Sequence, residues 1–474
     1  MADCCEATRD GHYDLAVIGA GSAGFSAAIT AAETGARVAL IGSGTIGGTC
    51  VNVGCVPSKT MIRMAEAVHG AATASRFPGV VGEAHVEDWQ AAIMGKDSLV
   101  ADLRRKKYID LLPAYPDIVY IEGRARFTAT GLLVDGAPFH ADRIVIATGA
   151  SPALPDIPGA AAVPYLTSTT ALSLPRLPRS LLVIGGGYIG CELAQMFARV
   201  GVAVTLVTRR RLLPDAEAEV AQALTGYLCA EGLGIETGLS YRGIAAGDGG
   251  IELVVERDGE ETTLAAEQVL FATGRRPNTQ GLGCAAAGIE TAPDGAIVVD
   301  SHMRTSRAGI YAAGDVTGRD PFVYMAAYGG KIAARNALEG DRHAYDNHAM
   351  PWVVFTDPQL AGVGLGEAQA RAAGIEPKVS VLPLDAVPRA LAARDTRGMI
   401  KLVADRQTDR LVGAQILAPE GSDSIGTAAL AIRAGLTTRQ LAEMILPYLT
   451  TVEGLKLAAQ AFEKDIARLS CCAG

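Results

Sequence analysis

Two glycine-rich turns, each lying between a short apolar strand and a helix, constrain the fold of this chain more than any other feature. Residues 19–24 read GAGSAG and residues 185–190 read GGGYIG, so both follow the pattern G-x-G-x-x-G. The first glycine allows a tight turn, the second lets a pyrophosphate approach the backbone, and the third lets the helix pack on the strand. Either motif alone is weak evidence, but two in this context predict two dinucleotide-binding Rossmann-like units. The glycines assigned to these sites are Gly19, Gly21, Gly24, Gly185, Gly187 and Gly190.

The rest of the chain extends this duplication and then departs from it. Residues 144–149 and 269–274 are apolar stretches that both end in Ala-Thr-Gly, and the proline-rich residues 151–164 resemble a crossover between domains. After about residue 345, strand-like and helical segments alternate without a glycine motif. We therefore predict an α/β fold with two Rossmann-like dinucleotide-binding domains and a C-terminal α+β domain for self-association.

Composition excludes several classes of partner. The 474 residues include 42 Lys and Arg against 51 Asp and Glu, a net charge of −9, without a basic tract. Nucleic acid is therefore not expected as a partner, because phosphate binding needs clustered cations. No apolar run reaches the roughly eighteen residues of a spanning helix, and the first residues lack the pattern of a signal peptide. We expect a cytoplasmic protein without membrane insertion, whose nine cysteines suit redox or metal chemistry better than structural disulfides.

Cys50 and Cys55 lie five positions apart in a glycine-rich segment, residues 47–59, that enters a predicted helix. A regular helix would hold their Cα atoms beyond the roughly 7 Å that a disulfide tolerates. The helix entry must therefore be distorted, which the glycines of this segment permit. A helix N-terminus also favours thiolate over thiol. Two unconnected buried cysteines are the alternative, but the spacing and the adjacent nucleotide fold favour a redox-active pair.

Residues 47–59, GGTCVNVGCVPSK, resemble the redox-active segment of the FAD-dependent pyridine nucleotide-disulfide oxidoreductases, and the order of units is similar over essentially the whole chain. The resemblance implies an FAD-binding domain from residues 1–154 and 275–345, and an NADPH-binding domain from residues 155–274. Residues 346–474 would form a dimerisation domain that ends in a cysteine-containing tail. A homodimer with shared active sites is implied as well.

The same resemblance assigns roles near the cofactors. Asp315 matches the residue that holds the ribityl chain of the flavin, and Lys59 with Glu192 matches an ion pair near the flavin N5. A cation there would stabilise the reduced flavin, although an ordinary surface salt bridge is the alternative. Tyr188 matches a residue that gates the access of NADPH to the flavin. Further FAD contacts are implied for Thr49, Ala125, Thr148, Gly149 and Val323.

The residues after the second strand of each unit indicate which nucleotide binds. In the second unit Arg209 and Arg210 follow the strand, where an acidic residue would hold a free ribose 2′-hydroxyl. Arginines suit a 2′-phosphate, so we predict NADPH, with a solvated charge run as the alternative. In the first unit Gly42 stands where the family usually has an acidic residue, so the adenosine ribose of FAD must find other partners.

The C-terminal region departs from the usual pattern of the family's disulfide reductases, which is His-Pro-Thr-x-x-Glu with the histidine as general acid/base. Residues 448–453 read YLTTVE, so Glu453 is present but Tyr448 replaces the histidine. A tyrosine, with an ordinary pKa of about 10, is a poor proton shuttle at neutral pH. This substitution argues against a glutathione- or lipoamide-type substrate.

Cys471 and Cys472 are adjacent near the end of the chain. A disulfide between neighbours would be strained, so we interpret them as a mobile dithiol, and thiolates are the ligands that soft metal ions prefer. With Cys50 and Cys55 they predict the transfer of a thiophilic ion between two dithiols. This combination resembles the mercury(II)-reducing branch of the family. It implies reduction of Hg(II) by NADPH through FAD, after the partner subunit's tail takes the metal from small-thiol complexes.

Roles for individual residues follow from that branch. Cys55 would be the thiolate beside the flavin and Cys50 the interchange thiol. Tyr448 would lie near this inner pair and Tyr108 across from it, with core packing as the alternative for both. Two other functions stay open: a disulfide reductase with an unusual acid/base residue, and a thiol-rich metal-binding protein without turnover.

The remaining cysteines are isolated in the sequence. Cys4 and Cys5 are either an additional mercury ligand or part of a disordered end. The other three are predicted to be buried structural thiols, and they are Cys191, Cys229 and Cys284.

Overall fold

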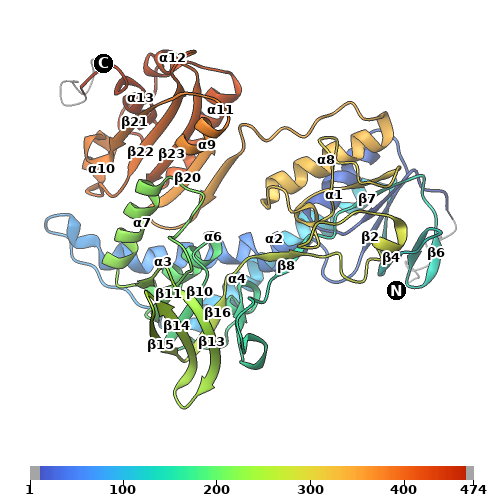
Figure 1. The fold of residues 1–474 in the computed structure, drawn as a ribbon, viewed down its shortest axis with the longest axis horizontal. Coiled ribbons are helices and arrows are strands. Elements are labelled where there is room, and N and C mark those ends of the chain that lie inside the picture. The colour runs from blue at the N-terminus through green and yellow to red at the C-terminus, as the bar shows by residue number, and fades with distance from the viewer. Residues whose placement is uncertain (1–10, 466–474) are drawn as a thin grey trace. The chain divides into compact units, whose positions relative to one another are not determined.

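The computed structural model describes residues 11–465, which divide into two compact units (Figure 1). Unit 1 takes in the residues up to Thr60 together with Gln90–Ala153 and Gly274–Asp346. Unit 2 takes in Met61–Trp89, Leu154–Thr273 and the residues from Asn347 onward. No helix among the described residues is both long and apolar enough to cross a membrane. The three-domain boundaries drawn from the sequence stay a prediction.

Unit 1 is built on a parallel five-stranded sheet in the order β18-β7-β1-β2-β3. The strands are β1 (Leu15–Ile18), β2 (Val38–Gly42), β3 (Ile118–Glu122), β7 (Arg143–Ile146) and β18 (Ile310–Ala312). Strands β1 and β2 are buried along their whole length, as expected where helices cover a parallel sheet. Unit 1 also contains a small antiparallel sheet of β4 (Ala125–Phe127), β5 (Leu132–Val134) and β6 (Ala137–Phe139).

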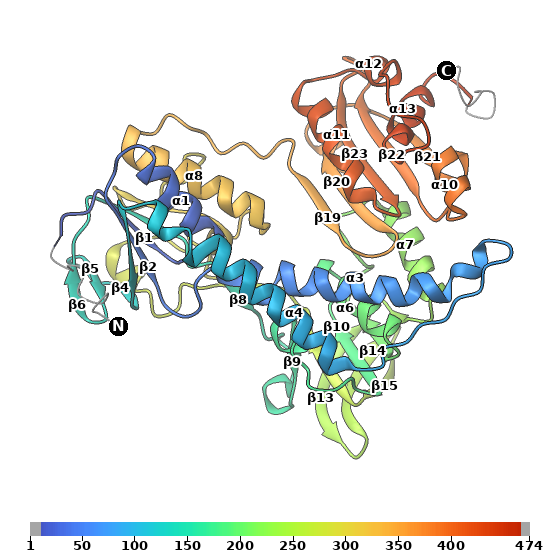
Figure 2. The same ribbon diagram turned by 180° about the vertical axis from the view of Figure 1, so that it is seen from behind.

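Helices α1 (Ser22–Ala32) and α8 (Val323–Glu339) lie side by side in both views (Figure 2). Small residues bring their backbones together, because a Cβ added at Gly330 would lie 2.2 Å from the carbonyl oxygen of Ala23. The Ser26 hydroxyl donates a hydrogen bond of 2.7 Å to the carbonyl of Ala327. The packing of α1 is thus mainly apolar and close.

Unit 2 contains the second Rossmann-like sheet, in the order β12-β11-β10-β16-β9 with parallel pairing throughout. Its strands are β9 (Leu166–Thr167), β10 (Ser180–Ile184), β11 (Ala203–Val207), β12 (Gly234–Glu236) and β16 (Gln268–Phe271). Beside it, an antiparallel sheet consists of β13 (Ser240–Gly247), β14 (Gly250–Arg257) and β15 (Glu260–Ala266). The helices of this part are α5 (Ser168–Ala171), α6 (Tyr188–Arg199) and α7 (Ala218–Ala230).

The last part of unit 2 is an antiparallel sheet in the order β19-β20-β23-β22-β21 with helices packed on it. This is the α+β arrangement predicted after residue 345. The strands are β19 (Pro351–Val354), β20 (Gln359–Gly364), β21 (Pro377–Pro383), β22 (Met399–Asp405) and β23 (Leu411–Ala418). The helices are α9 (Glu367–Ala372), α10 (Pro388–Ala393), α11 (Gly421–Arg433), α12 (Thr438–Ala442) and α13 (Glu453–Gln460).

A buried polar network ties α6 to this C-terminal sheet. The side chain of Gln195 exchanges two hydrogen bonds of 2.8 Å with the backbone of Asp357. The guanidinium of Arg199, 4% exposed, lies 2.7 Å from Glu231 and 2.9 Å from the Asp357 carboxylate. Arg397 contacts the same Asp357 carboxylate at 3.0 Å. Charged side chains therefore replace the small apolar contacts found around α1.

A short strand follows each of the two Ala-Thr-Gly segments, and these two strands pair with each other. Strand β8 (Ala150–Pro152) pairs antiparallel with β17 (Arg275–Pro277). The chain leaves unit 1 after Ala153 and returns at Gly274, so this two-stranded ladder marks both crossings.

Candidate functional site

The first glycine turn has the close contacts that its motif predicts. Gly19 has φ +116°, and a Cβ there would lie 2.2 Å from the carbonyl oxygen of Ala147. A Cβ at Gly24 would lie 1.7 Å from the carbonyl oxygen of Gly19, so helix α1 can pack this closely only with glycine. Nothing but the Cα of Gly48, at 3.5 Å, stands near the Cβ position of Gly21. The middle of the turn is thus open to a ligand at the helix N-terminus.

The second glycine turn repeats this geometry. Gly185 has φ +120°, and its Cβ would lie 2.3 Å from the carbonyl oxygen of Ala272. A Cβ at Gly190 would lie 1.8 Å from the oxygen of Gly185, whereas one at Gly187 would meet nothing within 4 Å. Both turns can therefore accept a pyrophosphate against bare backbone.

Thr148 and Gly149 form the loop that follows β7 in unit 1. The Thr148 hydroxyl donates to the carbonyl of Asn278 at 2.9 Å, and the Asn278 amide donates back to the carbonyl of Thr148 at 2.9 Å. Gly149 has φ +70° with open space at its Cβ position. Asn278 was missed by sequence reasoning, since nothing in the sequence links it to a loop 130 positions away.

The two inner cysteines lie on two successive helices. Helix α2 (Gly48–Val53) carries Cys50, and helix α3 (Cys55–Ala72) begins at Cys55. Gly54 separates them, and a Cβ there would lie 2.9 Å from the carbonyl oxygen of Thr49 and 3.3 Å from the Cα of Cys50. The predicted distortion is present at Gly54, between the two cysteines, whereas Gly47 is the N-cap of α2 and Gly48 is its first residue.

A side-chain hydrogen bond joins the two sulfurs. This bond is the main cause that raises the pKa of the Cys50 thiol, followed by burial and by the charge of Cys55. The nearby Lys59 acts in the opposite direction. The raised pKa means that Cys50 holds its proton more firmly than an ordinary thiol does.

Tyr108 lies beside the cysteine pair in a single π-helical turn, Arg105–Ile109, that follows α4 (Trp89–Arg104). Its ring stands edge-on to Phe25 with centroids 4.9 Å apart, and its ring carbons come within 3.2 Å of the Cβ position of Gly47. Burial raises the pKa of Tyr108, a hydrogen bond with Ser22 lowers it, and the charges of the two cysteines raise it. The hydroxyl therefore stays protonated near the sulfurs.

Asp315 lies after β18 in the turn Asp315–Thr317 and faces an arginine that sequence reasoning missed. Its Oδ2 lies 3.8 Å from Nε of Arg275, and burial raises the pKa of this carboxyl group. Arg275 also donates to the carbonyl of Ala150 and, at 3.5 Å, to the hydroxyl of Thr49. The one sequence signal for Arg275 is its place directly after the second Ala-Thr-Gly. Ala125 begins β4 and Val323 begins α8, both in unit 1.

The three arginines after β11 do different things. Arg211 donates to the backbone carbonyls of Leu213, Pro214 and Ala216 at 3.0, 2.7 and 2.6 Å and so holds its own loop. Arg209 is exposed and lies over the ring of Tyr241, 5.1 Å from its centroid. Arg210 is exposed and has no partner among the described residues. Arg209 and Arg210 are thus the two cations available to a phosphate.

Tyr188 is the first residue of α6 and contacts an aromatic residue of the C-terminal sheet. Its ring stands edge-on to Trp352 with centroids 5.9 Å apart. Trp352 packs flat against β20, because a Cβ at Gly362 would lie 2.3 Å from the indole. Burial is the main cause that raises the pKa of Tyr188 to about 12. Trp352 was not singled out from the sequence.

Lys59 and Glu192 lie in different units, so their ion pair stays a prediction. Glu192 is buried in α6, and its Oε1 accepts a hydrogen bond of 2.9 Å from the backbone N–H of Phe355. Tyr448 is 48% exposed in the turn before α13. Glu453, the first residue of α13, accepts a hydrogen bond of 3.2 Å from the N–H of Leu449 and so holds that turn.

Four of the nine cysteines fall outside the described residues. Cys4, Cys5, Cys471 and Cys472 are in this group, and their roles stay predictions. Cys191 and Cys284 are buried as predicted. The prediction for Cys229 was wrong, because this thiol is exposed on α7. The buried face of α7 includes Leu224 and Leu228, and the next residue along a helix points away from that face.

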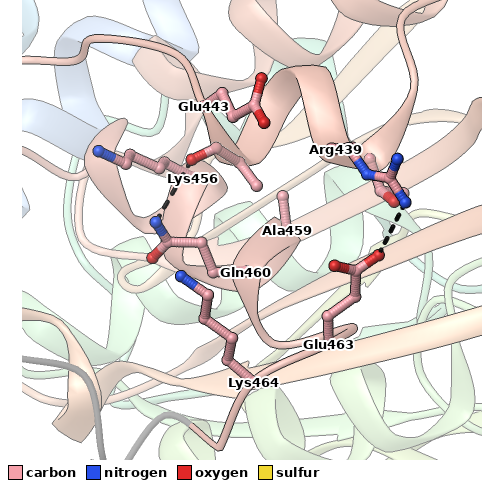
Figure 3. Close-up of a pocket in the computed structure, with 9 residues that line it drawn as sticks. Arg439, Glu443, Lys456, Ala459, Gln460, Glu463 and Lys464 are labelled. Carbon is pink, nitrogen blue, oxygen red and sulfur yellow. Dashed lines mark hydrogen bonds and ion pairs between the residues drawn. The ribbon is translucent and has the colours of Figure 1, made fainter. Parts of the chain in front are cut away.

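One pocket lies among α12, α13 and the residues after them, and it contains none of the residues predicted from the sequence (Figure 3). Arg439 faces Glu463 across it at 3.5 Å. The amide nitrogen of Gln460 donates to the carbonyl of Ala442 at 3.3 Å, and most of the other polar side chains that line the pocket are charged.

Comparison with known proteins identifies this arrangement. Residues 13–331 match the pyridine nucleotide-disulphide oxidoreductase family, and residues 350–459 match the dimerisation domain of that family. The chain therefore belongs to the pyridine nucleotide-disulphide oxidoreductase family. The resemblance and the fold class predicted from the sequence are confirmed.

Within this family the chain is similar to mercuric reductases. It is 47% identical to that of Staphylococcus aureus over 468 residues, which cover 98% of this chain and 85% of the relative. It is also 47% identical to that of Streptomyces lividans, over 98% of both chains. Among solved structures, it is similar to the HOCl-induced flavoprotein disulfide reductase RclA from Escherichia coli, with a TM-score of 0.83 and 34% identity over 94% of this chain and 99% of that one. A Cu(II) complex of the same reductase gives a TM-score of 0.81, with 32% identity over 95% of this chain and 99% of the other.

Proposed function

We propose that this chain is an FAD-dependent mercury(II) reductase that uses NADPH and serves mercury detoxification. The observation that carries the proposal is the 47% identity to mercuric reductases over 98% of the chain. The balanced reaction is Hg(II) plus NADPH giving Hg(0), NADP⁺ and one proton.

The residues present fit both cofactors. The first glycine turn and Asp315 would hold FAD, and the second turn with Arg209 and Arg210 would hold NADPH. Bound FAD would supply the capacity to take a hydride from NADPH and to deliver two electrons to the metal. Tyr188, packed against Trp352, would control access to the nicotinamide side, and Lys59 with Glu192 would place a charge near the flavin.

The inner cysteines would bind the metal ion as a pair of thiolates. Both sulfurs must be deprotonated when Hg(II) binds, because metal-bound thiols are thiolates, and the raised pKa of Cys50 makes its proton harder to remove in the absence of the metal. Tyr108 lies beside them as a neutral hydroxyl. We further propose that Cys471 and Cys472 of the partner subunit deliver the ion from small-thiol complexes, near Tyr448.

The assembly and the cellular compartment both bear on this delivery. Residues 350–459 match a dimerisation domain, so a homodimer is the expected assembly, and sharing of active sites across it is part of the proposal. Thiols that must stay reduced to exchange a metal suit a reducing compartment, so we place the protein in the cytoplasm.

A disulfide reductase is the second candidate, because RclA, with a TM-score of 0.83, is named a flavoprotein disulfide reductase. The test uses purified protein with NADPH, excess small thiol and Hg(II), followed by NADPH absorbance and by release of elemental mercury. We expect one Hg(0) per NADPH. Faster turnover of a disulfide than of Hg(II) would favour the second candidate, and stoichiometric Hg(II) binding without a volatile product would indicate a binding protein.

A further inference from the structure

The end of β2 is the place where this chain departs from the usual Rossmann pattern. An acidic side chain at this point normally accepts the ribose hydroxyls of the bound dinucleotide. Here the strand ends at Gly42, which is buried. A Cβ at Gly42 would lie 2.9 Å from the Cβ of Ala20, in the phosphate turn, and 3.0 Å from the hydroxyl oxygen of Tyr120. Another side chain therefore already occupies the direction in which an acidic residue would extend.

Tyr120 reaches this place from the neighbouring strand. In the parallel register of β2 and β3, Tyr120 pairs with Leu40 and Glu122 pairs with Gly42, so the tyrosine ring extends one step toward the carboxyl end of the sheet. The side chain is half-buried, and its hydroxyl has no hydrogen-bond partner among the described residues. Ligands of open parallel sheets bind at this same end of the strands.

The hydroxyl is present in its neutral form. Burial is the main cause that raises the pKa of Tyr120, and the negative charge of Glu122 raises it further. A protonated phenol can both donate and accept a hydrogen bond, so it can pair with a sugar hydroxyl in either direction.

We propose that the Tyr120 hydroxyl, at the place left open by Gly42, binds the adenosine ribose hydroxyls of FAD. This inference rests on the proposed use of FAD. It predicts that tyrosine and glycine act together, because a longer side chain at position 42 and the ring of Tyr120 compete for one place.

The test is a titration of apoprotein with FAD, followed by flavin fluorescence. Tyr120→Phe should raise the Kd about three- to tenfold, the effect of one ordinary hydrogen bond. An FAD analogue without the 2′- and 3′-hydroxyls of the adenosine ribose should bind wild-type protein more weakly than FAD does. The same analogue and FAD should bind the Tyr120→Phe variant with nearly equal affinity.

Two further variants separate this contact from general damage. Tyr115→Phe removes a hydroxyl before the amino end of β3 and should leave the Kd unchanged. Gly42→Ala should weaken FAD binding, because its Cβ would lie 2.9 Å from Ala20, in the phosphate turn, and 3.0 Å from the Tyr120 hydroxyl.

Two results would overturn the inference. One is a Tyr120→Phe variant that binds FAD as wild type does. The other is an analogue penalty of equal size in wild type and variant. Wild-type apoprotein that does not bind FAD at all would remove the proposed function as well, so the two failures are distinguishable.

Discussion

Each of the two Rossmann-like units has its own phosphate turn. The two turns have the same geometry, but the residues packed around them differ. The Cβ positions of Gly24 and Gly190 lie 1.7 and 1.8 Å from the carbonyl oxygens of Gly19 and Gly185, so the turns are nearly superimposable in their contacts. Beyond the turn, α1 packs on α8 through small residues, whereas α6 meets the C-terminal sheet through buried charges. The same phosphate turn is therefore supported by two different kinds of helix packing.

The largest expected effect concerns the cysteine pair of the first unit, whereas the second turn is contacted by a single buried thiol, that of Cys191. Cys50→Ala or Cys55→Ala should lower the rate of Hg(II)-dependent NADPH oxidation on the order of a thousandfold or more, because either change removes one of the two proposed thiolate ligands of Hg(II). Stopped-flow reduction of the flavin by NADPH should persist. Cys229→Ala, which changes an exposed thiol on α7, is the matched control and should keep full activity.

Because α6 and α1 are packed differently, we expect substitutions on the two helices to lower the free energy of unfolding by different amounts. Arg199→Met should lower the free energy of unfolding by about 3 kcal/mol, because it removes the most buried cation of the network and leaves Glu231 and Asp357 with Arg397 alone. Ser26→Ala on α1 should cost only about 1 kcal/mol, the usual contribution of one hydrogen bond. Denaturant unfolding of both flavin-loaded variants measures the difference. Equal losses would show that the charged contacts of α6 carry no special weight.

The arginines after β11 provide a test of nucleotide choice. Arg209→Ala combined with Arg210→Ala should lower kcat/KM for NADPH about 10- to 100-fold while leaving that for NADH nearly unchanged, because charged hydrogen bonds to the 2′-phosphate are lost. Arg211→Ala should change the ratio of the two cofactors little and should instead loosen its loop. A preference for NADPH that survives the double change would contradict the assignment.

The smallest expected effect is a pH dependence at the polar network. Burial is the main cause that lowers the pKa of His69, and Arg199 adds to it, although Glu231, at 3.7 Å, acts in the opposite direction. The folded protein then binds this proton less readily than the unfolded chain, so stability falls as the pH drops below about 6.5. His69→Gln should remove on the order of 1 kcal/mol or less of that fall between neutral pH and pH 5. Parallel unfolding slopes for wild type and variant would exclude His69 as the cause.

Sequence patterns predicted the elements because they are local. The glycine spacing, the apolar strands and the break in the cysteine segment all depend on neighbours a few positions apart. Arg275 and Trp352 were missed because their partners are distant in the sequence. Folding brings Arg275 near Asp315 and Trp352 near Tyr188. Cys229 was misjudged because isolation in the sequence gives no information on which face of a helix a residue occupies.

Gly54 has a consequence for the proposed metal ligands as well as for the fold. One residue separates α2 from α3, so the backbone torsions at that residue help to set the distance between the two sulfurs. A side chain at position 54 would press on the carbonyl of Thr49 and on the Cα of Cys50. Its first cost would therefore be the spacing of the two thiols rather than the stability of either helix.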